Sequence, residues 1–305
     1  MHSPDRLKYI NFSQLRSFYA VGRVQSFTKA AVWLNIGQPT VTTQVKALEE
    51  RFNVQLFDRS PNGLHLTDTG VALMKLARQI FALEEHAHSL LDSTGNSYGG
   101  KLHIGTVGSY FVMDFLVDYS EKFPLVQVSV VSGNSGVLYE RLLNYELDVA
   151  ILGRKYDDHK LEQLRLGAHE VAIIVDESHD WAAKSTISLE ELDGQRMIFR
   201  EEGSMTRRAL EEKLEEQSVK PNVIMELSRD SVVEAVAAGL GAGIISMEEF
   251  SPDERLTLIR IRSQPPMTNS YAACLRERRN IPAIDVFMRL VEKRLLLDSS
   301  TNPVD

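Results

Sequence analysis

The first residues suited to specific chemistry are polar side chains that share one face of a predicted helix near the amino end. Val41, Val45 and Leu48 recur at helical spacing and are expected to face a core. The opposite face then carries hydrogen-bonding groups, on Gln38, Thr40, Thr42, Thr43 and Lys46. Amides and hydroxyls at such positions can exchange hydrogen bonds with base edges in a DNA major groove. The pattern therefore predicts a helix that reads DNA.

Two shorter helices are expected to position this one. Apolar spacing predicts a helix over Ser13–Val24. Ser26 is a suitable N-cap for a second helix over Phe27–Leu34.

The turn before the polar helix has its own signals. Ile36 is expected to point inward and Gly37 to cap the third helix. Pro39 is tolerated in the first helical turn, where its missing N–H would have no partner, and the helix is expected to reach about Arg51. A helix, a tight turn and a second polar helix match a helix-turn-helix motif.

A hairpin is predicted over residues 54–66, with its turn at Pro61-Asn62-Gly63. A hairpin in this place would form a wing and carry Arg59. Basic side chains could bind DNA phosphates and fix the position of the protein along the duplex, and the candidates are Lys29, Lys46 and Arg59. An equally simple interpretation is that each is a lone basic residue on a solvated surface. The full set expected at DNA is Ser26, Thr28, Lys29, Gln38, Pro39, Thr40, Thr42, Thr43, Lys46 and Arg59.

A second group of polar residues lies where predicted strands lead into helices. Unpaired N–H groups at helix N-termini attract anions, and arginines nearby could add full charges. We therefore expect a small anionic effector, such as a phosphonate, a phosphate ester or a carboxylate. The expected set is Ser109, Asn134, Ser135, Arg154, Arg200, Ser204, Met205, Thr206 and Arg207. In the competing interpretation, the hydroxyls only cap helices, and the arginines face solvent or pair with Glu201, Glu202 or Glu211.

The elements around these residues alternate between strands and helices. The predicted strands are 101–107, 126–131, 148–152, 171–175, 197–199, 222–226 and 243–246, and the predicted helices are 110–123, 136–145, 206–216 and 231–238. This order indicates a parallel sheet covered on both faces. Crossings after Glu170 and near Pro265-Pro266 would divide the sheet into two lobes with a cleft between them, a common place for a small ligand.

Thr67 is expected to cap a long helix that reaches about Ser93 and joins the two regions, followed by a linker from Ser93 to Gly100. Its apolar residues form a heptad seam of about three heptads, at Leu73, Leu76, Ile80, Leu83, Ala87 and Leu90. The seam predicts dimerisation, and the alternative is a helix packed on its own domain.

Charge is divided unevenly along the 305 residues. Residues 1–60 hold 8 Lys and Arg against 4 Asp and Glu, a net charge of +4, whereas residues 61–305 hold 26 against 38, a net charge of −12. The first segment can approach phosphates and the remainder would be repelled by them. The single cysteine, Cys274, excludes an intramolecular disulfide and is expected in a buried strand.

Several other classes of function are disfavoured. No secretory signal and no apolar run of membrane-spanning length occurs, so a cytoplasmic protein without a membrane partner is expected. The glycines of residues 239–243 hint at a dinucleotide site, but they follow a predicted helix and precede a strand, the reverse of the required order. We therefore expect no cofactor, no metal site and no catalytic residues.

Taken together, the motifs resemble those of LysR-type transcriptional regulators over essentially the whole chain. The resemblance rests on residues 26–31 (SFTKAA), Leu34, 38–42 (QPTVT), 48–50 (LEE), 56–59 (LFDR) and 66–70 (LTDTG), with 200–204 (REEGS) and 237–244 (AAGLGAGI) in the second region. It implies an α/β chain with an all-α winged helix-turn-helix N-terminal domain and a two-lobed periplasmic-binding-protein-like effector domain. It also implies a dimer-based tetramer on a dyad promoter site, DNA bending altered by a small effector, and RNA polymerase as a partner. Gln38, Pro39 and Thr42 would approach bases, whereas Thr43 departs from the family's frequent arginine and makes base preference uncertain.

The expected domains are a DNA-binding domain at 1–67, a linker and dimerisation helix at 68–94, and an effector-binding domain at 95–298. Lobe I would span about 99–169 and 267–298, and lobe II about 170–266. Locally the chain resembles the branch associated with aminoethylphosphonate catabolism, at residues 38–42, 133–135, 149–154 with 157–158, and 204–208. Two alternatives stay open: a solute-binding protein of a transporter, and an enzyme on the same two-lobed fold.

Overall fold

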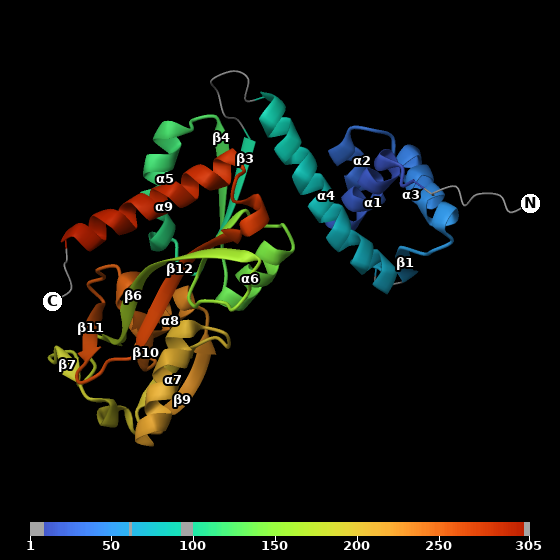
Figure 1. The fold of residues 1–305 in the computed structure, drawn as a ribbon. Coiled ribbons are helices and arrows are strands. Elements are labelled where there is room, and N and C mark those ends of the chain that lie inside the picture. Colours follow the sequence, from blue (N-terminus) through green and yellow to red (C-terminus); the bar gives the residue numbers. More distant parts are fainter. Residues whose placement is uncertain (1–8, 61–62, 93–99, 302–305) are drawn as a thin grey trace, which may run out of the picture. The chain divides into compact units, whose positions relative to one another are not determined.

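The computed structural model describes residues 9–60, 63–92 and 100–301 (Figure 1). The chain forms two compact units, Met1–Leu91 and Asp92–Asp305, which are described separately below. Among the described residues, no helix is both long and apolar enough to span a membrane.

The first unit consists of helices and one hairpin. Its elements are α1 (Phe12–Val24), α2 (Phe27–Leu34), α3 (Gln38–Phe52), β1 (Phe57–Ser60), β2 (Gly63–Leu66) and α4 (Asp68–Asp92). β1 and β2 pair antiparallel. Three helices followed by a hairpin confirm the predicted helix-turn-helix with a wing.

Capping residues set the helix starts in this unit. Asn11 Oδ1 accepts hydrogen bonds from the amides of Ser13 and Gln14, and Ser26 Oγ accepts one from Lys29 N at 3.3 Å. At the start of α4, Thr67 Oγ1 accepts one from Gly70 N at 3.0 Å. The predicted capping roles of Ser26 and Thr67 are therefore confirmed.

The core of the first unit confirms which face of α3 points inward. Val41 is fully buried, and Val45 and Leu48 are each 2% exposed. They pack with Phe18 and other apolar residues of α1, α2 and α4. The prediction for Ile36 is wrong, because this residue is 39% exposed. Asn35 adopts a left-handed conformation that ends α2, and the half-buried Leu34 packs against the core instead.

α4 divides its apolar residues between two faces. Leu73 and Ile80 pack on the first unit's own core, as do the buried Met74, Ala77 and Phe81. Leu76, Leu83 and Ala87 are exposed. The residues of the predicted heptad seam therefore lie on two faces of α4. One face packs on the core of its own unit, as the alternative interpretation held, and the other face is exposed. The side chain of Leu90 and the predicted linker over 93–99 lie outside the described residues.

The second unit is built on a twisted sheet with helices packed against it (Figure 1). Its strands are β3 (Gly100–Thr106), β4 (Val126–Ser132), β5 (Val149–Leu152), β6 (Leu161–Asp176), β7 (Thr186–Ile187), β8 (Arg196–Arg200), β9 (Asn222–Leu227), β10 (Ala242–Ser246), β11 (Leu256–Ile261) and β12 (Met267–Leu275). The helices are α5 (Tyr110–Lys122), α6 (Ser135–Leu143), α7 (Met205–Gln217), α8 (Arg229–Ala237) and α9 (Pro282–Thr301), with short 3₁₀ helices η1 (Leu189–Leu192), η2 (Met247–Glu249) and η3 (Arg276–Arg278). The strand order is β4-β3-β5-β12-β6-β10-β8-β9, with β11 beside β6 and β7 beside β11.

The predicted parallel sheet is found in part, because strands are parallel within two groups and antiparallel between them. β3, β4 and β5 are parallel, and so are β10, β8 and β9, but β12 and β6 run antiparallel between the two groups. β6 is 16 residues long; its first part pairs with β12 and its last part with β10 and β11. In β6, Glu170 pairs with Met267 of β12, whereas Val171 pairs with Ser246 of β10, and β11 precedes β12. The chain therefore passes between the two groups after Glu170 and again between β11 and β12, near the two predicted places. The lobe limits proposed from the sequence stay a prediction.

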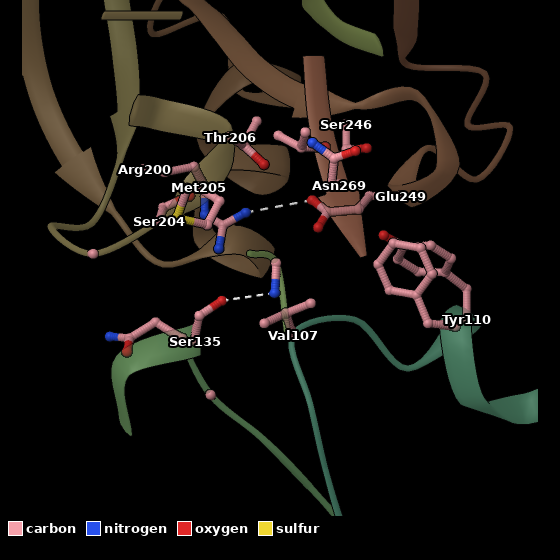
Figure 2. A pocket seen from close by; sticks show the side chains of 16 residues that line it. Val107, Tyr110, Ser135, Arg200, Ser204, Met205, Thr206, Ser246, Glu249 and Asn269 are labelled. Carbon is pink, nitrogen blue, oxygen red and sulfur yellow. Dashed lines mark hydrogen bonds and ion pairs between the residues drawn. The ribbon is translucent and has the colours of Figure 1, made fainter. Parts of the chain in front are cut away.

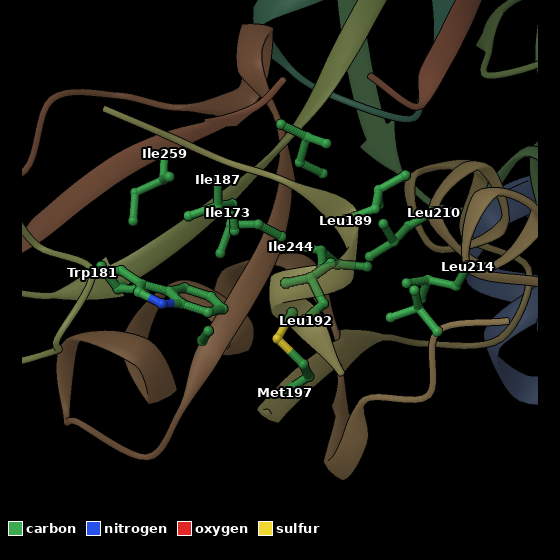
Figure 3. Close-up of a cluster of buried hydrophobic side chains, with 14 of the residues drawn as sticks. Ile173, Trp181, Ile187, Leu189, Leu192, Met197, Leu210, Leu214, Ile244 and Ile259 are labelled. Atoms are coloured by element: carbon green, nitrogen blue, oxygen red, sulfur yellow. The ribbon is translucent and has the colours of Figure 1, made fainter. Parts of the chain in front are cut away.

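Apolar side chains fill both faces of each group of strands. Figure 3 shows one such cluster, in which Trp181 packs near Ile173, Ile187 and Ile259. Cys274 is fully buried in β12, as expected, and burial together with the charge of Glu162 raises the pKa of its thiol to about 12. The glycine run of residues 239–243 follows α8 and leads into β10, which confirms the order that disfavours a dinucleotide site.

Candidate functional site

α3 presents its polar side chains outward from the first unit. Gln38, Pro39, Thr40, Thr43 and Lys46 are exposed, and Thr42 is half-buried. Gln38 Nε2 donates to Thr42 Oγ1 at 3.1 Å, and Thr42 Oγ1 donates to Gln38 O at 3.1 Å. These two bonds hold the Gln38 side chain along the helix at its N-terminal end. Gln38 Oε1 and the second amide proton stay available for a base edge.

The other residues expected at DNA belong to the same unit. Ser26, whose hydroxyl caps α2, is half-buried, while Thr28 and Lys29 are exposed in the first turn of that helix. Lys46 lies 3.5 Å from Glu50, an exposed pair that a phosphate could displace at little cost. Arg59 lies in β1 opposite Leu64.

The second unit contains a cavity of about 40 Å³ lined by both groups of strands and their helices (Figure 2). Six of the nine residues expected at an effector line it: Asn134, Ser135, Arg200, Ser204, Met205 and Thr206. The polar lining residues that the sequence did not suggest are Tyr110, Ser246, Glu249, Thr268 and Asn269. Ser246 ends a strand, so the reasoning applied to Asn134 could have found it. Nothing in the local sequence pointed to Glu249 or Asn269.

Two helix N-termini meet at this cavity, one from each group of strands. Asn134 Oδ1 caps α6 by accepting from Val137 N at 3.0 Å, and Ser204 Oγ caps α7 by accepting from Arg207 N at 3.4 Å. Asn134 and Ser204 therefore cap helices and line the cavity at the same time. The interpretation of these residues as helix caps does not exclude their interpretation as ligand-binding residues. Each helix start contributes amide N–H groups and the positive end of a helix dipole.

Gly153 allows the two helix starts to approach one another. A Cβ at this position would lie 2.9 Å from Met205 Cγ and 3.0 Å from Ser135 Oγ. The Gly153 amide donates to Ser135 Oγ at 2.8 Å, which leaves the Ser135 hydroxyl proton able to bind an acceptor in the cavity.

Arg200 lines the cavity but its charge is already compensated. Its Nε and Nη2 donate to the two carboxylate oxygens of Glu201 at 2.9 and 3.0 Å, and its Nη1 donates to Glu249 Oε2 at 3.3 Å. Burial raises the pKa of Glu201, but the hydrogen bond and charge of Arg200 outweigh it and hold that pKa below its usual range. Arg200 therefore lines the cavity as expected, and it also pairs with Glu201, as the competing interpretation held.

Three predicted residues lie outside this lining, as far as the described residues define it. Ser109 is exposed, is already helical in its backbone, and makes no capping hydrogen bond with its side chain among the described residues. Arg154 is exposed and places its guanidinium 4.5 Å from the ring centroid of Tyr156. Arg207 donates to Glu211 at 2.7 Å and lies 2.8 Å from Glu226. In the last two cases, a nearby ring or carboxylate competes successfully for the cation.

Two hydroxyl groups in the lining lack hydrogen-bond partners within the described part of the chain. They are Tyr110 Oη and Ser246 Oγ, and Ser246 is only 3% exposed. Burial, with the charge of Glu249, raises the pKa of Tyr110 far above its ordinary value, so the phenol stays protonated. A buried polar group without a partner is costly, and a ligand that supplies one would gain affinity.

Known protein families match this chain in both of its units. The family model "LysR substrate binding domain" matches residues 95–296, and "Bacterial regulatory helix-turn-helix protein, lysR family" matches residues 12–71. The chain is 31% identical over 244 residues to the HTH-type transcriptional activator CmpR of Synechocystis sp., covering 79% of this chain and 80% of that one. It is 29% identical over 298 residues to the transcriptional regulator CbbR of Sinorhizobium medicae, covering 93% of each.

Solved structures show the same fold. Full-length OxyR from Pseudomonas aeruginosa superposes with a TM-score of 0.73 at 19% identity, covering 93% of this chain and 95% of that chain. Full-length CbnR in complex with its target DNA superposes with a TM-score of 0.70 at 20% identity, covering 93% and 99%. With both family models matched along its length, the chain belongs to the LysR family of ligand-responsive, DNA-binding transcriptional regulators, and it is not an enzyme.

Proposed function

We propose that this regulator binds a dyad promoter site through α3 and changes transcription when a small anionic effector occupies the cavity of the second unit. The observation that supports the anion is the meeting of the α6 and α7 N-termini in one cavity, beside the Ser135 hydroxyl, whose proton is left for an acceptor. Phosphate esters, phosphonates and carboxylates all fit this chemistry. The narrower resemblance to the aminoethylphosphonate branch finds no support among the relatives described above.

The remaining parts of the proposal concern partners and location. RNA polymerase is the proposed downstream partner, and the cytoplasm, where promoter DNA is found, is the proposed location. The family membership favours a regulator over the two alternatives, a transporter's solute-binding protein and an enzyme.

The effector class is tested by titrating the full-length chain with phosphate esters, phosphonates and carboxylates. The melting temperature and the affinity for the operator are measured at each concentration. Unchanged melting with every anion would refute the anionic class.

The proposed role of Gln38 in reading bases predicts the effect of one substitution. Gln38→Ala should weaken binding to an operator fragment from the chain's own upstream promoter by about tenfold, since a good side-chain contact to a base is worth about 1–3 kcal/mol. Binding to unrelated DNA should hardly change, because phosphate contacts remain. Both affinities are measured by gel shift at one fixed salt concentration.

Gln217→Ala provides the matched control, since Gln217 is an exposed residue of α7 in the other unit. It should leave operator affinity unchanged. If Gln38→Ala binds the operator as tightly as the unmodified chain does, Gln38 has no role in base recognition.

We also propose that the chain forms a dimer, and from it a tetramer, through the exposed apolar face of α4. Leu76 and Leu83 are 55% and 62% exposed and lie seven residues apart, on one side of the helix. Leu83→Asp would place a charge in this interface and should convert the dimer to monomers in analytical ultracentrifugation. Leu83→Met keeps the apolar surface and should preserve the dimer. A dimer that persists in Leu83→Asp would mean that α4 does not join the subunits.

A further inference from the structure

A buried carboxylate lines the cavity opposite the helix N-termini. Glu249 belongs to η2, its side chain is 7% exposed, and Arg200 Nη1 lies 3.3 Å from its Oε2. In Figure 2, Ser135, Ser204 and Met205 lie on one side of the cavity and Tyr110 on the other, with the Glu249 carboxylate between Arg200 and Tyr110. The cavity therefore has an anion-attracting end and an end that carries negative charge.

The charge of Glu249 is only partly compensated by its neighbours. Arg200 directs two of its N–H groups to Glu201, at 2.9 and 3.0 Å, and reaches Glu249 through Nη1 alone at a longer distance. Arg229 also acts on Glu249, but its own groups donate to Asp230 and to Val107 O. Burial raises the pKa of Glu249 above its usual range, against the opposing charges of Arg200 and Arg229, and a cation placed beside it would favour the charged carboxylate.

The hydroxyls without partners lie around this carboxylate. The Ser246 backbone amide hydrogen-bonds to Glu249, and the charge of Glu249 acts on Tyr110, so all three residues are neighbours in the lining. The Glu249 carboxylate and the hydroxyl oxygens of Tyr110 and Ser246 are three groups that can accept hydrogen bonds. An ammonium group has three N–H donors and no acceptor, so it matches one donor to each of these groups.

We propose that the effector is dipolar, with an anionic group at the starts of α6 and α7 and an ammonium group that binds Glu249, Tyr110 and Ser246. This inference rests on the proposed effector cavity and names the class of ligand that it takes. A purely anionic molecule would satisfy the helix starts but would place its remaining atoms against a buried carboxylate. The same carboxylate would therefore select the dipolar ligand and reject the simple anion.

Matched pairs of small molecules test the proposal on the full-length chain by calorimetry. Each pair differs only in the ammonium group: phosphoethanolamine with ethyl phosphate, 2-aminoethylphosphonate with ethylphosphonate, and β-alanine with propionate. In at least one pair, the ammonium member should bind at least about tenfold more tightly, as expected for a hydrogen bond between charged groups.

Substitutions test whether the Glu249 carboxylate causes the preference for the ammonium member of each pair. Glu249→Gln should remove it, so that both members of the pair bind with similar affinity. Glu248→Gln is the matched control, because this neighbour in η2 has a side chain that is 58% exposed and does not line the cavity. It should retain the full preference. Tyr110→Phe removes a hydroxyl that has no hydrogen-bond partner among the described residues, so the variant should fold normally and weaken binding of only the ammonium member, by about threefold or more.

The outcomes separate this inference from the broader proposal. If the simple anions bind as tightly as their ammonium counterparts, the dipolar ligand is refuted and the anionic effector stands. If no member of any pair binds, both proposals fail. If the Glu249→Gln variant still prefers the ammonium member, the assignment of this preference to Glu249, Tyr110 and Ser246 is refuted. If Glu249→Gln does not fold, an unchanged preference in Tyr110→Phe refutes the same assignment.

Discussion

Gly70→Ala is expected to destabilise the first unit by at least about 3 kcal/mol and to abolish operator binding at the growth temperature. A Cβ at Gly70 would lie 2.2 Å from the carbonyl oxygen of Leu56, and this oxygen also accepts the Thr67 amide at 3.0 Å. Because the obstacle is backbone, no side-chain rotation relieves it, and either α4 or the start of the hairpin must move. The substitution would therefore displace α4 from the core that supports α3.

Each unit has its own tryptophan, which makes this effect measurable. Trp33 lies in α2 and Trp181 lies in the second unit. In a Trp181→Phe background, urea unfolding followed by fluorescence reports on the first unit, and the midpoint should fall sharply in Gly70→Ala. Gly37→Ala is the control, since a Cβ there would meet its nearest atoms at 3.7 Å. A midpoint no lower than in this control would show that the first unit absorbs the extra methyl group.

Asp148→Ala is expected to destabilise the second unit by about 3–5 kcal/mol, the usual cost of removing one member of a buried ion pair. Asp148 accepts the His103 backbone amide at 2.7 Å, and Arg278 Nη2 lies 2.7 Å from its other oxygen. Arg278 is 7% exposed, and its Nε and Nη1 already lack partners within the described part of the chain. The substitution would leave this guanidinium buried with no carboxylate to balance it. Urea unfolding followed through Trp181, in a Trp33→Phe background, measures the loss.

The pH dependence of this effect has a definite sign. Burial raises the pKa of Asp148, but the hydrogen bonds from His103 and the charge of Arg278 outweigh burial, so the folded-state pKa is lower than the ordinary value. Stability from such a group is complete above the unfolded pKa of about 4 and is lost as the pH falls through the lower folded pKa. The difference in stability between the parent chain and Asp148→Ala should thus be present at about pH 5 and above and shrink as the pH falls below about 4. A difference that grows below about pH 4 would contradict the charged pair.

The amino-terminal unit was largely predictable because its signals are local. Caps such as Ser26 and Thr67, the helical spacing of Val41, Val45 and Leu48, and the turn at Gly37 each act within a few residues. Ile36 was misjudged because whether a turn residue is buried depends on how two helices pack, and spacing within the turn does not contain that information.

The sequence by itself determined the order of elements from α1 to β5, the outward polar face of α3, and the strand-to-helix junctions that carry Asn134, Ser135, Ser204 and Thr206. Those features depend on contacts between residues close in the chain. Only the tertiary structure decided that β6 and β12 run antiparallel through the middle of the sheet, since strand direction depends on pairing between distant segments. It likewise decided that Arg200 pairs with Glu249, a residue 49 positions away, and that Arg207 is held by Glu226 outside the cavity. A charged side chain binds whichever partner the fold brings nearest, and that partner cannot be identified from the residues beside it in the chain.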